Sequence, residues 1–226
     1  MEKQTLHRVG AVCAGLGAIA TAVLYGMHTV SADTAGLPLV AGSSHFAEIH
    51  WGLIVGMVLM TLGLAAVTLT LREQPARHDA GGWAQLGLYF LLVGLALWIG
   101  VFVTEVAIKP LADGMTADPG LTGGARALAG LVDAGGTAAT IVNWLGIALL
   151  GTALLVSGRY PRWMGAIGLV LGAVISLGIG LPRAFLGQSA WTEKIGFPPL
   201  AFATLVWTLG LGVMLWRMAG AGQRRR

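Results

Sequence analysis

The chain has 226 residues, of which 56% are hydrophobic and only 11% are charged. A water-soluble domain carries roughly a quarter of its residues as Asp, Glu, Lys and Arg, so this composition excludes an ordinary soluble protein and predicts long apolar segments. The net charge of +4 does not indicate a nucleic-acid partner, because the basic residues stand at the ends of apolar segments.

Six apolar runs follow one another along the chain, and each is long enough to cross a lipid bilayer. Because lipid offers the backbone no hydrogen-bond partner, each run is expected to be helical. The predicted fold is therefore all-α: a polytopic membrane protein with a single domain over residues 1–226, folded as one compact bundle. The six transmembrane helices are predicted at about residues 9–30, 46–71, 83–108, 127–156, 163–181 and 197–218.

The basic residues are divided unevenly between the two sides of the predicted bundle, and the richer side of a membrane protein faces the cytoplasm. We therefore expect cytoplasmic N- and C-termini and, in a bacterium, a multi-pass protein of the inner membrane. The four on the poorer side are Lys109, Arg126, Arg183 and Lys194. The richer side has Lys3, Arg8, Arg72, Arg77, Arg159, Arg162, Arg217, Arg224, Arg225 and Arg226.

Polar side chains gather where the first two predicted helices reach the outer side. The first ends near His28, and the second begins with SHFAEIHW, which contains His45, Glu48 and His50. His45 and Glu48 are three residues apart and would share one face of a helix, whereas His50 would point away from Glu48. A metal site here would therefore need ligands from other helices. The alternative is that these histidines only decorate the membrane interface.

The later helices add charged groups at a similar depth. Glu105 is predicted about one turn from the outer end of the third helix, Asp133 lies in the fourth, and Arg183 follows the fifth. A carboxylate near the apolar layer is costly unless it is paired or functional. Glu105 is therefore expected either to join His28 and His50 as a ligand or to form a structural ion pair with Arg183.

Two pairs of glycines have the spacing that lets transmembrane helices approach closely. Gly52 and Gly56 stand four apart in the second helix, and Gly168 and Gly172 do so in the fifth. Small residues at this spacing are typical of helix–helix contacts in membranes. They are expected to be packing positions.

The stretch YPRWMGAIGLVLGAV, Tyr160–Val174, resembles a step found in bacterial inner-membrane proteins that are grouped only as domains of unknown function. In that step a Pro-Arg-Trp sequence precedes a glycine-rich helix. The resemblance covers one turn and one helix. It implies a bacterial bundle of six or seven helices, and it brings no activity or site residue to this chain.

The favoured function is an integral membrane binding protein with an outward-facing His/Glu pocket for a metal, haem or quinone. Its candidate ligands are His28, His45, Glu48, His50 and Glu105. A haem would have to be bound without a covalent attachment motif, and the chain has no nucleotide motif. Imidazole and carboxylate groups suit transition metals.

Two alternatives remain open at this stage. One is a small proton-linked transporter or permease that uses Glu105, Asp133 and Arg183 as coupling groups. The other is a non-catalytic subunit or scaffold that contacts the lipid bilayer and either another membrane protein or further copies of itself. Whether the protein is an enzyme is left open, because the spacing reveals no nucleophile with its base.

Overall fold

The computed structural model describes residues 3–28, 36–72, 79–187 and 195–221, and within these ranges it is helical and contains no strand. This confirms the all-α prediction. The elements are α1 (Lys3–Met27), α2 (Leu37–Gly42), α3 (Phe46–Arg72), α4 (Ala80–Gly114), α5 (Leu121–Ser157), α6 (Arg162–Ala173), the π-helix η1 (Val174–Gly180), α7 (Leu181–Leu186) and α8 (Phe197–Ala221).

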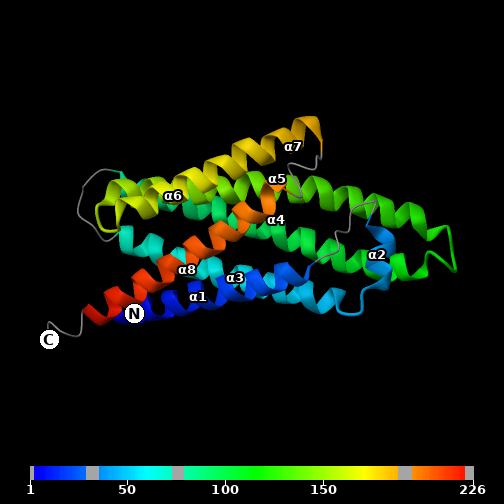
Figure 1. The fold of residues 1–226 in the computed structure, drawn as a ribbon, viewed down its shortest axis with the longest axis horizontal. Coiled ribbons are helices and arrows are strands. Elements are labelled where there is room, and N and C mark those ends of the chain that lie inside the picture. The colour runs from blue at the N-terminus through cyan, green and yellow to red at the C-terminus, as the bar shows by residue number, and fades with distance from the viewer. Residues whose placement is uncertain (1–2, 29–35, 73–78, 188–194, 222–226) are drawn as a thin grey trace.

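Six of the helical stretches in the described ranges are long and apolar enough to cross a membrane, and they form a compact bundle. The fifth of them joins α6, η1 and α7 end to end as Arg162–Leu186. Each span packs against the next one in the sequence, and α8 contacts both α1 and α6 to complete the arrangement. Helix α1 begins and α8 ends at the same end of the bundle (Figure 1). We call this the terminal end and the other the distal end.

Helices α4 and α5 are longer than the spans predicted at residues 83–108 and 127–156, and they project at the distal end (Figure 1). Helix α4 continues through Pro110 to Gly114. Its side chains Ile108 and Ala112 are almost fully buried in a distal apolar cluster that also contains Ala125 and Ala129 of α5. Packing between the two helices therefore outweighs the turn-forming tendency of this sequence.

The short helix α2 was not predicted, because six residues give no recognisable periodicity. Its Leu37 and Val40 are buried in the same distal cluster. The Nζ atom of Lys109 donates to the Ala41 carbonyl oxygen at 3.4 Å and so links α2 to α4. At the end of α7, Phe185 and Leu186 are 82% and 85% exposed. Residues 188–194, which follow, lie outside the described part of the chain.

Glycines set how closely the spans approach. A Cβ on Gly56 would lie 2.6 Å from Thr21 Oγ1, and one on Gly172 would lie 2.3 Å from the backbone nitrogen of Ala148. Gly52 faces Leu24, and Gly168 faces Trp207. Gly172 thus lies where two backbones pack directly, whereas Gly52, Gly56 and Gly168 make space for a side chain of the neighbouring helix.

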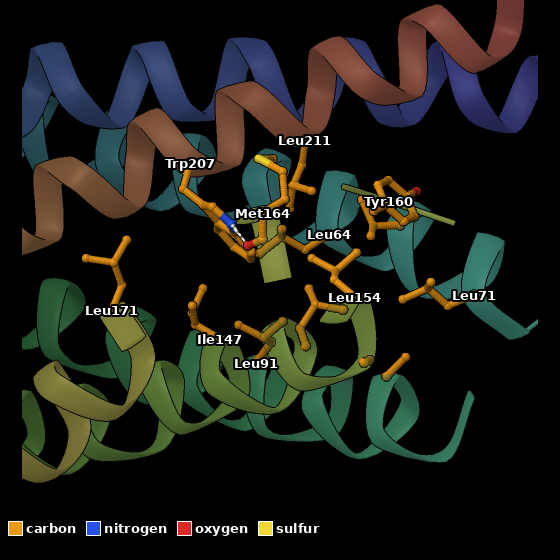
Figure 2. Close-up of a cluster of buried hydrophobic side chains, with 14 of the residues drawn as sticks. Leu64, Leu71, Leu91, Ile147, Leu154, Tyr160, Met164, Leu171, Trp207 and Leu211 are labelled. Atoms are coloured by element: carbon orange, nitrogen blue, oxygen red, sulfur yellow. Dashed lines mark hydrogen bonds between the residues drawn. The ribbon is translucent and has the colours of Figure 1, made fainter. Parts of the chain in front are cut away.

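The larger apolar core is built from side chains of several spans (Figure 2). Leu91, Ile147 and Leu154 are at most 1% exposed within it. Trp207 of α8 donates its indole N–H to the Met164 carbonyl oxygen of α6 at 2.8 Å. That bond satisfies the one polar group of the tryptophan inside an apolar core.

A small polar network fastens the turn between α5 and α6 to the end of α3. Arg159 donates to the Thr70 carbonyl oxygen at 2.8 Å, which satisfies a carbonyl left free at the end of the helix. Thr70 donates its hydroxyl proton to the Val67 carbonyl oxygen. The Tyr160 hydroxyl, 2.7 Å from Thr70 Oγ1, is therefore the donor of that bond.

Burial raises the pKa of Tyr160 to about 12 from its ordinary 10.0. Because the folded protein favours the protonated phenol, this contribution to stability is fully present below pH 10 and is lost as the pH rises towards 12. Two pKa units correspond to roughly 2–3 kcal/mol. Between pH 9 and 12, the melting temperature in detergent should fall more steeply with pH for the wild type than for Tyr160→Phe. If the melting temperatures of the two proteins fell in parallel, the raised pKa of Tyr160 would be contradicted.

Candidate functional site

Three of the predicted site residues lie in one layer of the bundle. His28 directly follows α1, His50 is in the first turns of α3, and Glu105 is in the distal part of α4. At about 1.5 Å per residue, His28 is about 30 Å from Arg8 and His50 about 33 Å from Arg72. The hydrocarbon core of a bilayer is roughly 30 Å thick. The layer therefore lies near the distal boundary of the apolar region.

His50 is the fixed centre of this layer. Its side chain is fully buried, and its Nδ1 lies 2.5 Å from the Phe46 carbonyl oxygen one turn earlier. The rings of Phe46 and Phe102 hold the imidazole at centroid distances of 4.0 and 5.8 Å. Because α3 packs between α1 and α4 in the bundle, His50 can reach groups on both neighbours.

Those groups are His28 and Glu105. The Nε2 atom of His50 lies 2.9 Å from the Nε2 atom of His28 and 2.9 Å from the Oε2 atom of Glu105. The third side of the triangle, from His28 Nε2 to Glu105 Oε2, is 3.7 Å. The side chain of His28 is 14% exposed, against 5% for Glu105. We call these three residues the His/Glu cluster.

The hydrogen bonds of His50 indicate what the His/Glu cluster could hold. A carbonyl oxygen can only accept, so the Nδ1 atom of His50 carries the proton donated to Phe46, and Nε2 is the ring atom directed at Glu105 and His28. The carboxylate of Glu105 and the Nε2 atom of His28 face the same point. Electron pairs that converge in a buried place require a shared proton or a positive ion.

The triangle also has the size of a metal site. A circle through points separated by 2.9, 2.9 and 3.7 Å has a radius of about 1.9 Å, so a position slightly out of the plane is about 2.0–2.2 Å from all three atoms. That is the usual range for nitrogen and oxygen ligands of zinc. The hydrogen bond from His50 Nδ1 to a backbone carbonyl is the typical support of a metal-bound imidazole.

Haem does not fit between the same two histidines. An iron bound on opposite sides by imidazoles needs about 4 Å between their nitrogens, which is two bonds of about 2.0 Å each. The Nε2 atoms of His28 and His50 are 2.9 Å apart, and their rings meet edge to face. The arrangement in this structure therefore does not accommodate an iron bound axially by both histidines.

The other candidates predicted from sequence lie outside the His/Glu cluster. His45 precedes the first residue of α3, and both His45 and Glu48 have exposed side chains. Arg183 of α7 donates to the carboxylate of Asp133 in α5 at 3.4 Å. In the structure Arg183 thus contacts Asp133, and Glu105 contacts the two histidines.

Sequence reasoning missed the residues that orient the cluster. Phe46 supplies both the carbonyl oxygen and a ring face to His50, and Phe102 supplies a second ring. The spacing was available as a signal, because Phe46 is four residues before His50 and Phe102 is three before Glu105, so each shares a helix face with its ligand. Apolar residues are too common in such a chain for this signal to stand out.

Comparison of the chain with protein-family models, curated proteins and solved structures found no match. The class of the protein therefore rests on the fold and on the cluster. It is a helical protein with six spans suited to a membrane, in which two histidines and one glutamate from three helices meet in a buried layer.

Proposed function

We propose that this chain is a multi-pass membrane protein that binds one divalent transition-metal ion at His28, His50 and Glu105. The observation that carries the proposal is the convergence of three ligand atoms from three different spans within bonding reach of one point. A purely structural ion pair would need only one histidine beside the carboxylate. The second imidazole, directed at the same point, is what favours a metal.

The donor set favours one class of ion. Two imidazole nitrogens and one carboxylate oxygen suit Zn²⁺, Fe²⁺, Co²⁺ and Ni²⁺, whereas Mg²⁺ and Ca²⁺ prefer oxygen ligands alone. Three protein ligands leave at least one coordination position for water or another small ligand. The site therefore resembles chemically reactive or exchangeable metal sites more than closed structural ones.

We further propose a bacterial inner-membrane location with both termini in the cytoplasm. Arg8, Arg72, Arg159 and Arg217 stand near the terminal end of the spans, and fewer basic residues stand at the distal end. This imbalance supports a cytoplasmic terminal end. The His/Glu cluster would then face the opposite compartment, close to the membrane surface.

Zinc binding to the purified protein in detergent tests the proposal. We expect about one Zn²⁺ per chain, and Mg²⁺ in millimolar excess should not displace it. His45→Ala is the matched control, because it removes an exposed histidine from the same end of α3 and should leave binding unchanged. Isothermal titration calorimetry and elemental analysis give the affinity and the stoichiometry. Absence of stoichiometric zinc in the wild type, or its loss in His45→Ala, would overturn the assignment.

A further inference from the structure

Resting on the proposed metal site, we infer that the ion enters and leaves the His/Glu cluster only from the distal end of the bundle, past His28. The bundle would then be a one-sided metal receptor and not a conduit across the membrane. This distinguishes it from the transporter considered above. The inference follows from what lies on each side of the cluster.

Towards the terminal end, the interior is filled. Leu53, Leu64, Leu91, Ile147 and Leu150 are each at most 1% exposed. Leu64, Leu91 and Ile147 come from three different spans and belong to one buried apolar cluster (Figure 2). No Asp, Glu, Lys or Arg is among the buried residues of the described spans except Glu105 itself.

The spans approach closely at two glycine contacts on this side of the cluster. A Cβ on Gly17 of α1 would lie 2.3 Å from the backbone nitrogen of Met60 in α3. A Cβ on Gly94 of α4 would lie 2.7 Å from the Cα atom of Asn143 in α5. Because a methyl group does not fit at these two contacts, a hydrated ion cannot pass between the helices there.

Three of the buried hydroxyls on this side are engaged with the backbone. Those of Thr68, Thr140 and Ser176 donate to the carbonyl oxygens of Leu64, Gly136 and Ile141. A divalent ion without ligands would have to give up its hydration in this medium, at a cost of tens of kcal/mol by simple continuum reasoning.

Towards the distal end, the ligands differ in how tightly they are held. His50 is fully buried and fixed by Phe46, and Glu105 is nearly as buried. His28 follows the last residue of α1 and is the most exposed of the three ligands, at 14% of its side chain. His28 is therefore the ligand that can release first and exchange the ion with the distal side.

Oriented vesicles test this inference. The full chain, carrying a histidine-free epitope tag at its C-terminus, is loaded with Zn²⁺ in detergent and reconstituted at fewer than one molecule per vesicle. An antibody resin then separates vesicles with the termini outside from those with the termini inside. EDTA, which does not cross the bilayer, is added to both fractions, and the zinc retained per chain is measured.

We expect the termini-out fraction to keep about one zinc per chain, and the termini-in fraction to lose at least nine-tenths of it. Dissolving either fraction in detergent should let EDTA remove the rest. Loss from the termini-out fraction, or retention in both fractions, would overturn one-sided access. A sample that holds no zinc before EDTA is added would instead refute the metal site itself, so the two failures are distinguishable.

Discussion

Replacing His50 with alanine is expected to lower the affinity of the protein for zinc by about 100-fold or more. The variant loses the central ligand of a three-residue site, and a factor of ten corresponds to about 1.4 kcal/mol of binding free energy. Loss of a supporting hydrogen bond alone costs 10- to 100-fold in characterised metal sites, so loss of a ligand should cost at least as much. Zinc titration of the purified variant in detergent measures the change.

The same substitution also affects the metal-free protein. Glu105 is buried and its carboxylate contacts His50 at 2.9 Å, so His50→Ala leaves a buried charge with only the more distant His28. Breaking a buried pair in this way costs about 3–5 kcal/mol. The double variant His50→Ala, Glu105→Gln removes the unpaired charge and should recover part of the lost thermal stability but none of the zinc affinity. Wild-type affinity in either variant would contradict the site.

Gly151→Ala is expected to destabilise the folded protein by about 3 kcal/mol or more, the upper range for an overpacked contact. The added Cβ would lie 2.2 Å from the backbone nitrogen of Leu169, so α5 and α6 would have to separate. Backbone atoms cannot move aside as a flexible side chain can. Thermal unfolding and size-exclusion chromatography in detergent report the effect.

Gly100→Ala is the control for that experiment. Gly100 lies in the middle of α4 with nothing within 4 Å of an added Cβ. Alanine is a better helix former than glycine by about 1 kcal/mol, so this variant should be as stable as the wild type or slightly more stable. Equal destabilisation by the two substitutions would show that the α5–α6 contact is not as close as described.

The six spans could be predicted from sequence because they depend on a strong local signal. A run of about 20 apolar residues must be helical in lipid, whatever its neighbours are. The boundaries at the distal end could not be predicted in the same way. Residues 109–125 contain Pro110 and several glycines, and only the burial of Ile108 and Ala112 against α2 and α5 explains why helix continues there.

The candidate site was predicted in part for the same reason. Depth along a helix follows from residue number, so His28, His50 and Glu105 could be placed in one layer. The rotation of each helix about its axis could not be predicted. Nearly every face of these helices is apolar, so hydrophobicity does not indicate which side faces inward. Glu48 and His45 therefore stayed candidates beside His50, whose place inside the bundle follows from the packing of α3 between α1 and α4.

X-ray absorption at the zinc edge of the loaded wild-type protein examines the coordination of the ion itself. We expect a shell of nitrogen and oxygen ligands at about 2.0–2.2 Å with outer scattering from two imidazoles, and the loss of one imidazole in His28→Ala. A zinc ion coordinated by oxygen alone, or a spectrum identical in the wild type and His28→Ala, would contradict the proposed site.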